Sequence, residues 1–379
     1  MKILFMPYPS TSGTWGCTVY MYAIAYKARQ QGHDVLFHAC APSSRLIADG
    51  FPVASFAGAD PAESRRPIAD IYDVFHALGL DHEGYYHYLI RAESEVIDRY
   101  QPDVIVADMR PSATISAYRT GTPLVCLASA ATDPRWPVGP ESRPLDDLAL
   151  RLTSRYGGPQ ITRFPELLYW TADRKIATSF PEFEPELRNV QGLDYVGYLD
   201  SPQREQPIAD ADVPRGLVLA YLSTVGWSSP RLIDSVARTV ERLGMTLWCV
   251  TNARGAAGSL ATRSRVFDYL PLNTLLPRAE AILFHGGQGT ALASVYHAVP
   301  SIVCPGDNYE RRYNAARIAD LGCGVFAETR DLRPARLVDL LSTIVDDAAF
   351  NLSAAAASTK LLAQSGPAGA LRVVERAAG

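Results

Sequence analysis

The sequence predicts an α/β protein built from two parallel, doubly wound sheets. Short apolar runs alternate with helix-like segments along the chain, which is the pattern of strand, helix and parallel strand. The 379 residues, 47% of them hydrophobic, exceed the usual size of a single core. A polar, proline-bearing stretch at residues 200–214 separates two segments of similar length, as a linker would.

The predicted strands and helices follow from these apolar runs. In the first half we expect strands at residues 3–7, 34–39, 52–56, 103–108, 123–128 and 174–180, and helices at 17–31, 85–100 and 112–119. In the second half we expect strands at residues 217–223, 245–251, 265–270, 281–285, 301–305 and 324–327, with helices between them. Further helices are expected around Ala354 and over the tail 368–378.

The composition argues against several classes of protein. A formal net charge of −4 without a block of lysine or arginine disfavours a nucleic-acid partner. The six cysteines are scattered without Cys-x-x-Cys spacing, so neither a zinc site nor a disulfide framework is indicated. No apolar stretch approaches the ~20 residues that span a bilayer, and a buried first strand explains the apolar start better than a signal peptide. We therefore expect a cytoplasmic protein.

A glycine-rich turn follows the apolar run 281–283. The segment His285-Gly286-Gly287-Gln288-Gly289-Thr290 leads into a helix-prone stretch at residues 291–298, so it reads as strand, tight turn and helix. Such a turn directs unpaired backbone N–H groups and the positive end of a helix dipole at one point, and glycines let a phosphate approach the backbone. The pattern predicts an anion site, to which His285 adds a side-chain donor.

The turn is followed at fixed spacings by Ala298-Val299-Pro300, Pro305, the segment 310–315 and Leu321-Gly322-Cys323-Gly324. Together these residues resemble the signature of family 1 glycosyltransferases of the GT-B fold, particularly bacterial enzymes that attach sugars to natural products. The resemblance implies two Rossmann-like, doubly wound domains facing a cleft. It places an acceptor-binding domain at residues 1–205, a nucleotide-sugar-binding domain at 206–365, and a C-terminal helix at 366–379 that crosses back to the first domain.

The resemblance also implies which residues bind the donor. The turn would hold the diphosphate, Tyr269 would stack on the base, and the backbone of Leu270 would hydrogen-bond to it. Ser223 and Thr224 match the family only in part, and they either contact the phosphates or precede a capped helix. The full predicted donor set is Ser223, Thr224, Tyr269, Leu270, His285, Gly287, Gln288, Gly289, Thr290, Glu310 and Arg311, with Ser129 from the first domain.

Glu310 and Arg311 depart from the family, which usually has Asp-Gln where the sugar hydroxyls are bound. A guanidinium in place of an amide turns a two-way hydrogen-bonding group into a charged donor. This argues against glucose and favours a deoxysugar, or a sugar with an acidic or acceptor-rich group. The alternative is that Arg311 pairs with Glu310 or points to solvent.

The catalytic residues depart further from the family. Gly16 and Gly32 have the family's spacing, but Cys17 stands where the family has its histidine general base. Asp108 matches the aspartate that partners this histidine, although it is also placed to cap a helix. Three alternatives stay open: the acceptor needs little help, another base such as Asp108, His82 or His87 serves, or the protein binds a donor without transferring sugar.

The acceptor pocket is expected around His82, Tyr85 and His87, in a stretch rich in aromatic residues that suits a flat aromatic or polyketide-like acceptor. Tyr22 and Tyr26 are expected to be ordinary packing residues.

The resemblance thus implies an inverting, metal-independent glycosyltransferase with a dTDP- or UDP-sugar as co-substrate and no cofactor. Its partners would be this donor and a small-molecule acceptor, with neither nucleic acid nor membrane, and a homodimer is an open alternative. Two other functions remain: a non-catalytic donor-binding or auxiliary homologue, and an enzyme that acts on the sugar nucleotide itself. A NAD-dependent dehydrogenase is disfavoured, because Gly13 and Gly16 do not form G-x-G-x-x-G.

Overall fold

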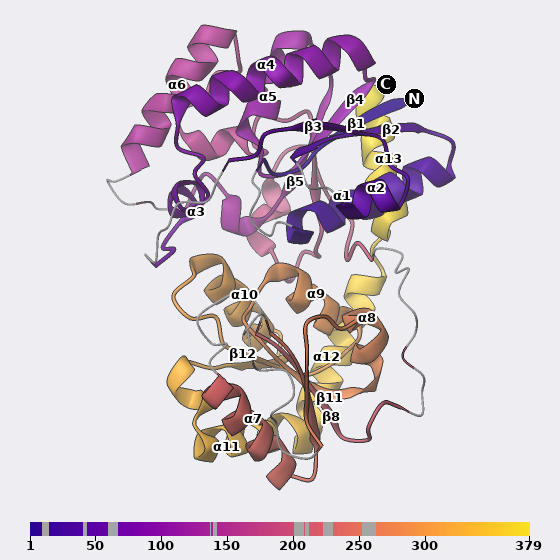
Figure 1. The fold of residues 1–379 in the computed structure, drawn as a ribbon, viewed down its shortest axis with the longest axis vertical. Helices are drawn as coiled ribbons and strands as arrows, with labels where there is room; N and C mark the ends of the chain where they lie inside the picture. The colour runs from indigo at the N-terminus through magenta and orange to yellow at the C-terminus, as the bar shows by residue number, and fades with distance from the viewer. Residues whose placement is uncertain are drawn as a thin grey trace. The chain divides into compact units, whose positions relative to one another are not determined.

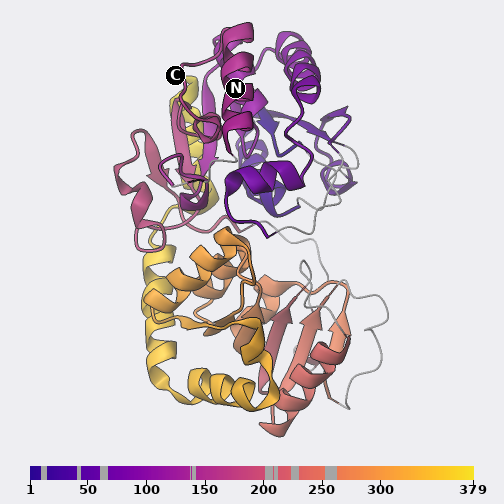
Figure 2. The ribbon, with the colours of Figure 1, turned by 90° about the vertical axis from the view of Figure 1, so that its left-hand side faces the viewer.

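The chain folds into two compact α/β units. The computed structural model describes residues 1–9, 15–40, 44–59, 67–136, 138, 142–200, 208, 212–222, 230–251 and 263–379, with the backbone alone at residues 15–17 and 44–45. The first unit comprises Met1–Pro202 with Gln364–Gly379, and the second comprises Gln203–Ala363. Each unit is built on one parallel sheet (Figure 1, Figure 2).

The first sheet has the strand order β3-β2-β1-β4-β5-β6-β7, and its neighbouring strands are all parallel. Its strands are β1 (Lys2–Met6), β2 (Asp34–Cys40), β3 (Val53–Phe56), β4 (Val104–Ala107), β5 (Leu124–Ala128), β6 (Arg174–Ala177) and β7 (Leu193–Tyr195). The central strand β4 is buried at every residue, as expected for a parallel sheet covered on both faces.

Seven α-helices are described in the first unit. They are α1 (Trp15–Gln30), α2 (Ser44–Ala48), α3 (Ile71–Ala77), α4 (Glu83–Tyr100), α5 (Pro111–Thr120), α6 (Arg143–Tyr156) and α13 (Gly366–Ala378). The C-terminal helix α13 packs beside α1 on the sheet, as Figure 1 shows, and buries Leu371 with Met21 and Val104. The last segment of the chain therefore belongs to the core of the first unit.

The second sheet has the order β10-β9-β8-β11-β12-β13 and is again parallel. Its strands are β8 (Leu217–Tyr221), β9 (Thr246–Val250), β10 (Arg265–Phe267), β11 (Ala279–Phe284), β12 (Ser301–Val303) and β13 (Gly324–Phe326). The α-helices are α7 (Pro230–Arg242), α8 (Leu272–Leu275), α9 (Gln288–Tyr296), α10 (Tyr309–Asp320), α11 (Pro334–Asp346) and α12 (Ala348–Leu362). Helices α7 and α11 bury Val236 and Leu341 against Val218 and Leu283 of the sheet, while α9 and α12 pack together.

The strand order defines where each unit can bind a ligand. In both sheets the order reverses at the first strand, between β1 and β4 and between β8 and β11. Ligands of open α/β sheets bind beyond the carboxyl ends of the strands at such a switch point. Asp108 directly follows β4 and His285 directly follows β11, so both lie at switch points.

The predicted fold class is confirmed, and the differences lie in details. Each of the predicted strands is present, but the one expected at residues 174–180 ends at Ala177, because the chain then turns with the Phe183 N–H bonded to the Phe180 carbonyl. The sequence analysis did not identify β7, α2, α3 or α6. Helix α9 begins at Gln288, three residues earlier than expected, which puts Gly289 and Thr290 inside its first turn. The predicted linker lies mostly outside the described residues.

Gly324 tests the close packing of β12 and β13. A Cβ added there would lie 2.1 Å from the Ser301 carbonyl oxygen, well inside the sum of the van der Waals radii of the two atoms. We expect Gly324→Ala to lower the free energy of unfolding by about 3 kcal/mol or more, because strands of the sheet must separate. Gly84→Ala on α4 is the matched control, since nothing lies within 4 Å of its added Cβ. Urea denaturation should show the control neutral or stabilised by up to about 1 kcal/mol, and equal stability of the two variants would contradict the packing described.

Candidate functional site

The turn between β11 and α9 is held in shape by α10. Gly286 has φ +88°, and a Cβ on it would lie 2.8 Å from the Arg311 carbonyl oxygen. Both the backbone conformation and the close approach therefore require glycine. Gly287 is the N-cap of α9 and makes no side-chain cap hydrogen bond. The Gln288 N–H is bonded to the Glu310 carboxylate, and the N–H groups that follow it lie at the positive end of the helix dipole, where an anion binds.

Two buried polar atoms of this turn have no protein partner in the described part of the chain. They are Nδ1 of His285, whose residue is 8% exposed, and Nε2 of Gln288. A buried polar group left unpaired costs about 1–3 kcal/mol, so native proteins rarely retain one without a reason. The His285 ring bonds to the Tyr221 backbone through its other nitrogen, so Nδ1 of the neutral ring is an acceptor, whereas Nε2 of Gln288 is a donor. Together with the end of α9, the two atoms indicate a place for a polar ligand.

The charge at this turn comes from Arg311 and the helix end rather than from the histidine. Burial, with the nearby charge of Arg311, lowers the pKa of His285 to about 3. The ring, which lies 5.8 Å from that of Tyr221, is therefore neutral near pH 7. Burial also lowers the pKa of Arg311 from its ordinary value. A bound anion would offset both desolvation costs.

The first turn of α10 faces the glycine-rich turn. Asn308 caps α10 by accepting the Arg311 N–H at 3.1 Å. Asn314 donates to the Gly286 carbonyl at 2.9 Å and to the Glu310 carboxylate at 3.2 Å. Burial raises the pKa of Glu310. The charge of Arg311 and a hydrogen bond from the Gln288 backbone act in the opposite direction and lower it. Asn314, to which the sequence analysis assigned no role, thus links the predicted sugar-binding residue to the predicted phosphate-binding turn.

The remaining predicted donor residues differ in their exposure to solvent. Tyr269 follows β10 and is 56% exposed, whereas the side chain of Leu270 is buried. An exposed ring at the carboxyl edge of the sheet is a position from which an aromatic residue can stack on a base. Ser223 and Thr224 lie outside the described residues.

Ser129, the predicted sugar contact from the first unit, has its hydroxyl engaged within the protein. The hydroxyl donates to the buried Glu184 carboxylate at 2.9 Å and accepts the Ala131 N–H at 3.3 Å. Burial raises the pKa of Glu184. These bonds give Ser129 a structural role at the end of β5, and its contact with a sugar remains a prediction.

Asp108 stands at the carboxyl end of β4 in an unusual backbone setting. It is 9% exposed, its N–H donates to the Met6 carbonyl at 3.3 Å, and the next residue, Met109, has φ +50°. A non-glycine residue rarely adopts this conformation unless its surroundings impose it. The N-cap of α5 is Arg110, so Asp108 precedes the helix rather than being its N-cap residue. Cys17 is the third residue of α1, and its side chain lies outside the described part.

A buried ionic network fixes the segment after Asp108. Arg110 donates to the Glu93 carboxylate at 2.8 Å and to the carbonyls of Pro7 and His38 at 3.2 and 2.7 Å. The hydroxyls of Ser112 and Ser116 each donate to Glu93 at 2.6 Å. Arg110 also lies 3.0 Å from Nδ1 of His38.

Burial and the charge of Arg110 lower the pKa of His38 to about 2, so this ring accepts the hydrogen bond as the neutral form. The network thereby joins the ends of β1, β2 and β4 to α4 and α5. The network was not predicted from the sequence.

The predicted acceptor residues on α4 have different surroundings. The Tyr85 hydroxyl donates to the carbonyls of Pro9 and Ala57 at 2.8 and 3.1 Å, next to the end of β1. Nδ1 of His87 lies 3.0 Å from the Tyr156 hydroxyl on α6. The His82 side chain is 76% exposed, with its ring 3.5 Å from the Asp81 carboxylate. Tyr22 and Tyr26 pack in the core as expected.

Comparison with known proteins shows what the chain is similar to. Residues 232–376 match the family described as erythromycin biosynthesis protein CIII-like, C-terminal domain. Among curated proteins, the chain is 26% identical to a 3-alpha-mycarosylerythronolide B desosaminyl transferase of Saccharopolyspora erythraea, over 74% of this chain and 70% of that protein.

Two solved structures share the whole fold. The glycotransferase of kitacinnamycin superposes with a TM-score of 0.78 at 17% identity, covering 99% of this chain and 98% of that one. Glycosyltransferase VinC, solved in complex with DTDP, superposes with a TM-score of 0.78 at 19% identity, covering 100% and 99%. The protein therefore has the GT-B fold. With the matches of its sequence, the predicted resemblance to bacterial natural-product glycosyltransferases of family 1 is confirmed.

Two features are absent from the residues that the structure describes. No helix among them is long and apolar enough to cross a membrane. Nor do three or more histidine, cysteine, aspartate or glutamate side chains gather there in a group able to hold a metal ion.

The buried pair Glu93–Arg110 yields a stability prediction. Glu93→Gln keeps the shape of the side chain but leaves the buried Arg110 charge uncompensated, so we expect a loss of about 3 kcal/mol or more in the free energy of unfolding. Glu95→Gln, an exposed position on the same helix, should change it by less than about 0.5 kcal/mol. Chemical denaturation of both variants measures the difference, and a tolerant Glu93→Gln variant would show that the network does not stabilise this region.

Proposed function

We propose that the protein is a glycosyltransferase that moves a sugar, expected to be a deoxysugar, from a thymidine diphosphate donor to a small-molecule natural product. The observation that carries this proposal is the β11–α9 turn, with two unpaired buried polar atoms beside the N-terminus of α9. A diphosphate has the oxygens and the negative charge that such a turn binds. The relatives support the choice of reaction, and DTDP in the VinC structure supports thymidine over uridine.

The diphosphate is the leaving group of this reaction, so the turn acts where negative charge develops. The helix end, the N–H groups and Arg311 stabilise that charge, which is how we propose that the transfer proceeds without a metal. Tyr269 and Leu270 would hold the base. Glu310, fixed by Asn314, would accept hydrogen bonds from sugar hydroxyls.

Asp108 is the proposed general base. In a direct displacement, the acceptor oxygen forms a bond to the anomeric carbon as the bond to the diphosphate oxygen breaks, and the proton of the acceptor hydroxyl passes to the Asp108 carboxylate. This single step inverts the anomeric configuration. Asp108 lies at the switch point of the first sheet, and the network of Arg110 and Glu93 fixes the chain that follows it.

His285→Ala tests the donor site. Loss of a hydrogen bond to a charged phosphate, donated by the ring tautomer that carries its proton on Nδ1, should weaken binding of TDP by roughly 1.5–3 kcal/mol, or roughly 10- to 150-fold in Kd. His297→Ala, at the opposite end of α9, is the matched control and should bind TDP as the wild type does. Isothermal titration calorimetry measures both. Equal affinity of the two variants would remove His285 from the donor site.

Asp108→Asn and Cys17→Ala together test the base. We expect Asp108→Asn to lower turnover by about 10²-fold or more, because the amide cannot take the proton, while Cys17→Ala keeps most of the activity. Turnover is measured with the donor and acceptor that give the highest wild-type rate. Full activity of Asp108→Asn would exclude the proposed base. Binding of TDP without transfer to any acceptor by the wild type would instead indicate an auxiliary, non-catalytic protein.

A further inference from the structure

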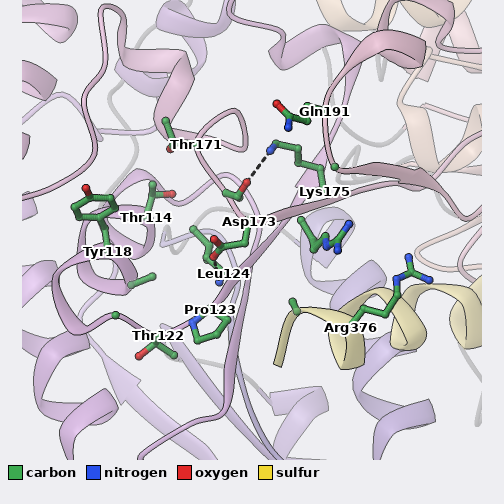
Figure 3. A pocket seen from close by; sticks show the side chains of 16 residues that line it. Thr114, Tyr118, Thr122, Pro123, Leu124, Thr171, Asp173, Lys175, Gln191 and Arg376 are labelled. Atoms are coloured by element: carbon green, nitrogen blue, oxygen red, sulfur yellow. Dashed lines mark hydrogen bonds between the residues drawn. The ribbon is translucent and has the colours of Figure 1, made fainter. Parts of the chain in front are cut away.

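A second hollow lies at the opposite edge of the first sheet, away from the candidate site. It has a volume of about 870 Å³ and is lined by α5, the amino ends of β5 and β6, the turn before β7, and the last turn of α13 (Figure 3). Asp108 and Ser129 follow the carboxyl ends of β4 and β5, whereas this hollow is beside the amino ends. It is therefore a separate feature of the first unit.

The wall of the hollow contains a buried lysine. Lys175 is 6% exposed, and its ammonium group donates to the Ala172 carbonyl at 2.6 Å. Among the described residues no carboxylate forms an ion pair with it, and the Asp173 charge acts on it from beyond ion-pair distance. An ammonium has three donors, of which the protein here fills one. Burial lowers the pKa of Lys175, and an uncompensated buried charge of this kind is costly.

Most of the charges around Lys175 are positive. Arg174 and Arg376 also line the hollow, and Asp173 is the one carboxylate among its lining residues. Asp173 is already engaged, since it accepts the Leu124 N–H at 2.8 Å. Arg376 donates one N–H to Asp194 at 2.8 Å and keeps its other donors. In a chain with a net charge of −4, a concave surface with three cations and one engaged carboxylate attracts anions.

Figure 3 shows Lys175, Gln191 and Asp173 on one side of the hollow and Arg376 on α13 at another. Tyr118, on α5, is among the exposed large side chains of the protein. The volume lies within the range of small-molecule sites and exceeds what a bare phosphate fills. The space therefore suits an organic anion whose charged group reaches Lys175.

We propose that this hollow binds a small-molecule oxyanion, a phosphate or a carboxylate, through the ammonium of Lys175 with Arg174 and Arg376 around it. The phosphate or carboxylate oxygens accept the donors of Lys175 that the protein leaves unfilled. Lysine is a common ligand of phosphate as a point charge, and its hydrogen bonds to an anion are about twice as strong as neutral ones. The proposal does not depend on the glycosyltransferase function.

The test is calorimetric titration of the full-length protein with inorganic phosphate, and in parallel with acetate, at constant ionic strength. We expect saturable binding that Lys175→Met weakens by about tenfold or more, because the variant keeps the unbranched stem and removes the charge. Arg174→Gln should weaken it by several-fold. Arg238→Gln, on α7 of the second unit and paired with Asp234, is the matched control and should leave binding unchanged.

Phosphate could also bind at the β11–α9 turn, and the variants separate the two sites. Binding at that turn is lost in His285→Ala and kept in Lys175→Met, and this pattern alone would overturn the proposal. The reverse pattern supports it. If phosphate binds more tightly than acetate, the ligand of the hollow carries a phosphate group. If acetate binds more tightly than phosphate, the ligand carries a carboxylate. No saturable binding of either anion, or binding unaffected by Arg174→Gln in a folded protein, would also overturn it.

Discussion

The first unit depends on one buried ion pair, between Arg110 and Glu93. Both side chains are shielded from solvent, and an isolated charge there would cost several kcal/mol. The pair is tolerated because its hydrogen bonds are filled by the carbonyls of Pro7 and His38 and by the hydroxyls of Ser112 and Ser116. Since these partners come from the ends of β1 and β2 and from α5, the pair also fixes the backbone at Met109. The position of Asp108 is therefore a consequence of this network.

The second unit achieves the same precision by different means. Its turn is shaped by backbone approach, with Gly286 against Arg311, and by Asn314, whose amide joins Gly286 to Glu310. This difference is physically reasonable, because a site for an anion must keep its donors unpaired, whereas a carboxylate base needs a rigid backbone beneath it.

The fold could be predicted from the sequence because it depends on long, regular signals. Buried parallel strands give apolar runs such as Ala281-Ile282-Leu283, and each is followed by a helical pattern. Short strands such as β7 contain too few residues to show a recognisable hydrophobic pattern. The network was missed because charged residues are almost never fully buried. One signal was present: Glu93 lies among Leu89, Ile90 and Ile97 at helical spacing, so a charged residue occupies the apolar stripe of α4. Its partner Arg110 came from a separate segment, and no local pattern joins them.

For the predicted donor site, the structure supplies properties of the residues that the sequence could not. Sequence resemblance identified His285 and the glycines, but it could not show that the histidine is neutral or that its Nδ1 is unpaired. Both properties come from tertiary burial and from Arg311, a residue that departs from the family. A neutral imidazole beside a guanidinium divides the work of binding: the ring contributes a directional hydrogen bond, and Arg311 with the helix end contributes the charge. Because Gly286 and Asn314 fix the turn before any ligand arrives, little reorganisation of its backbone is required when a diphosphate binds.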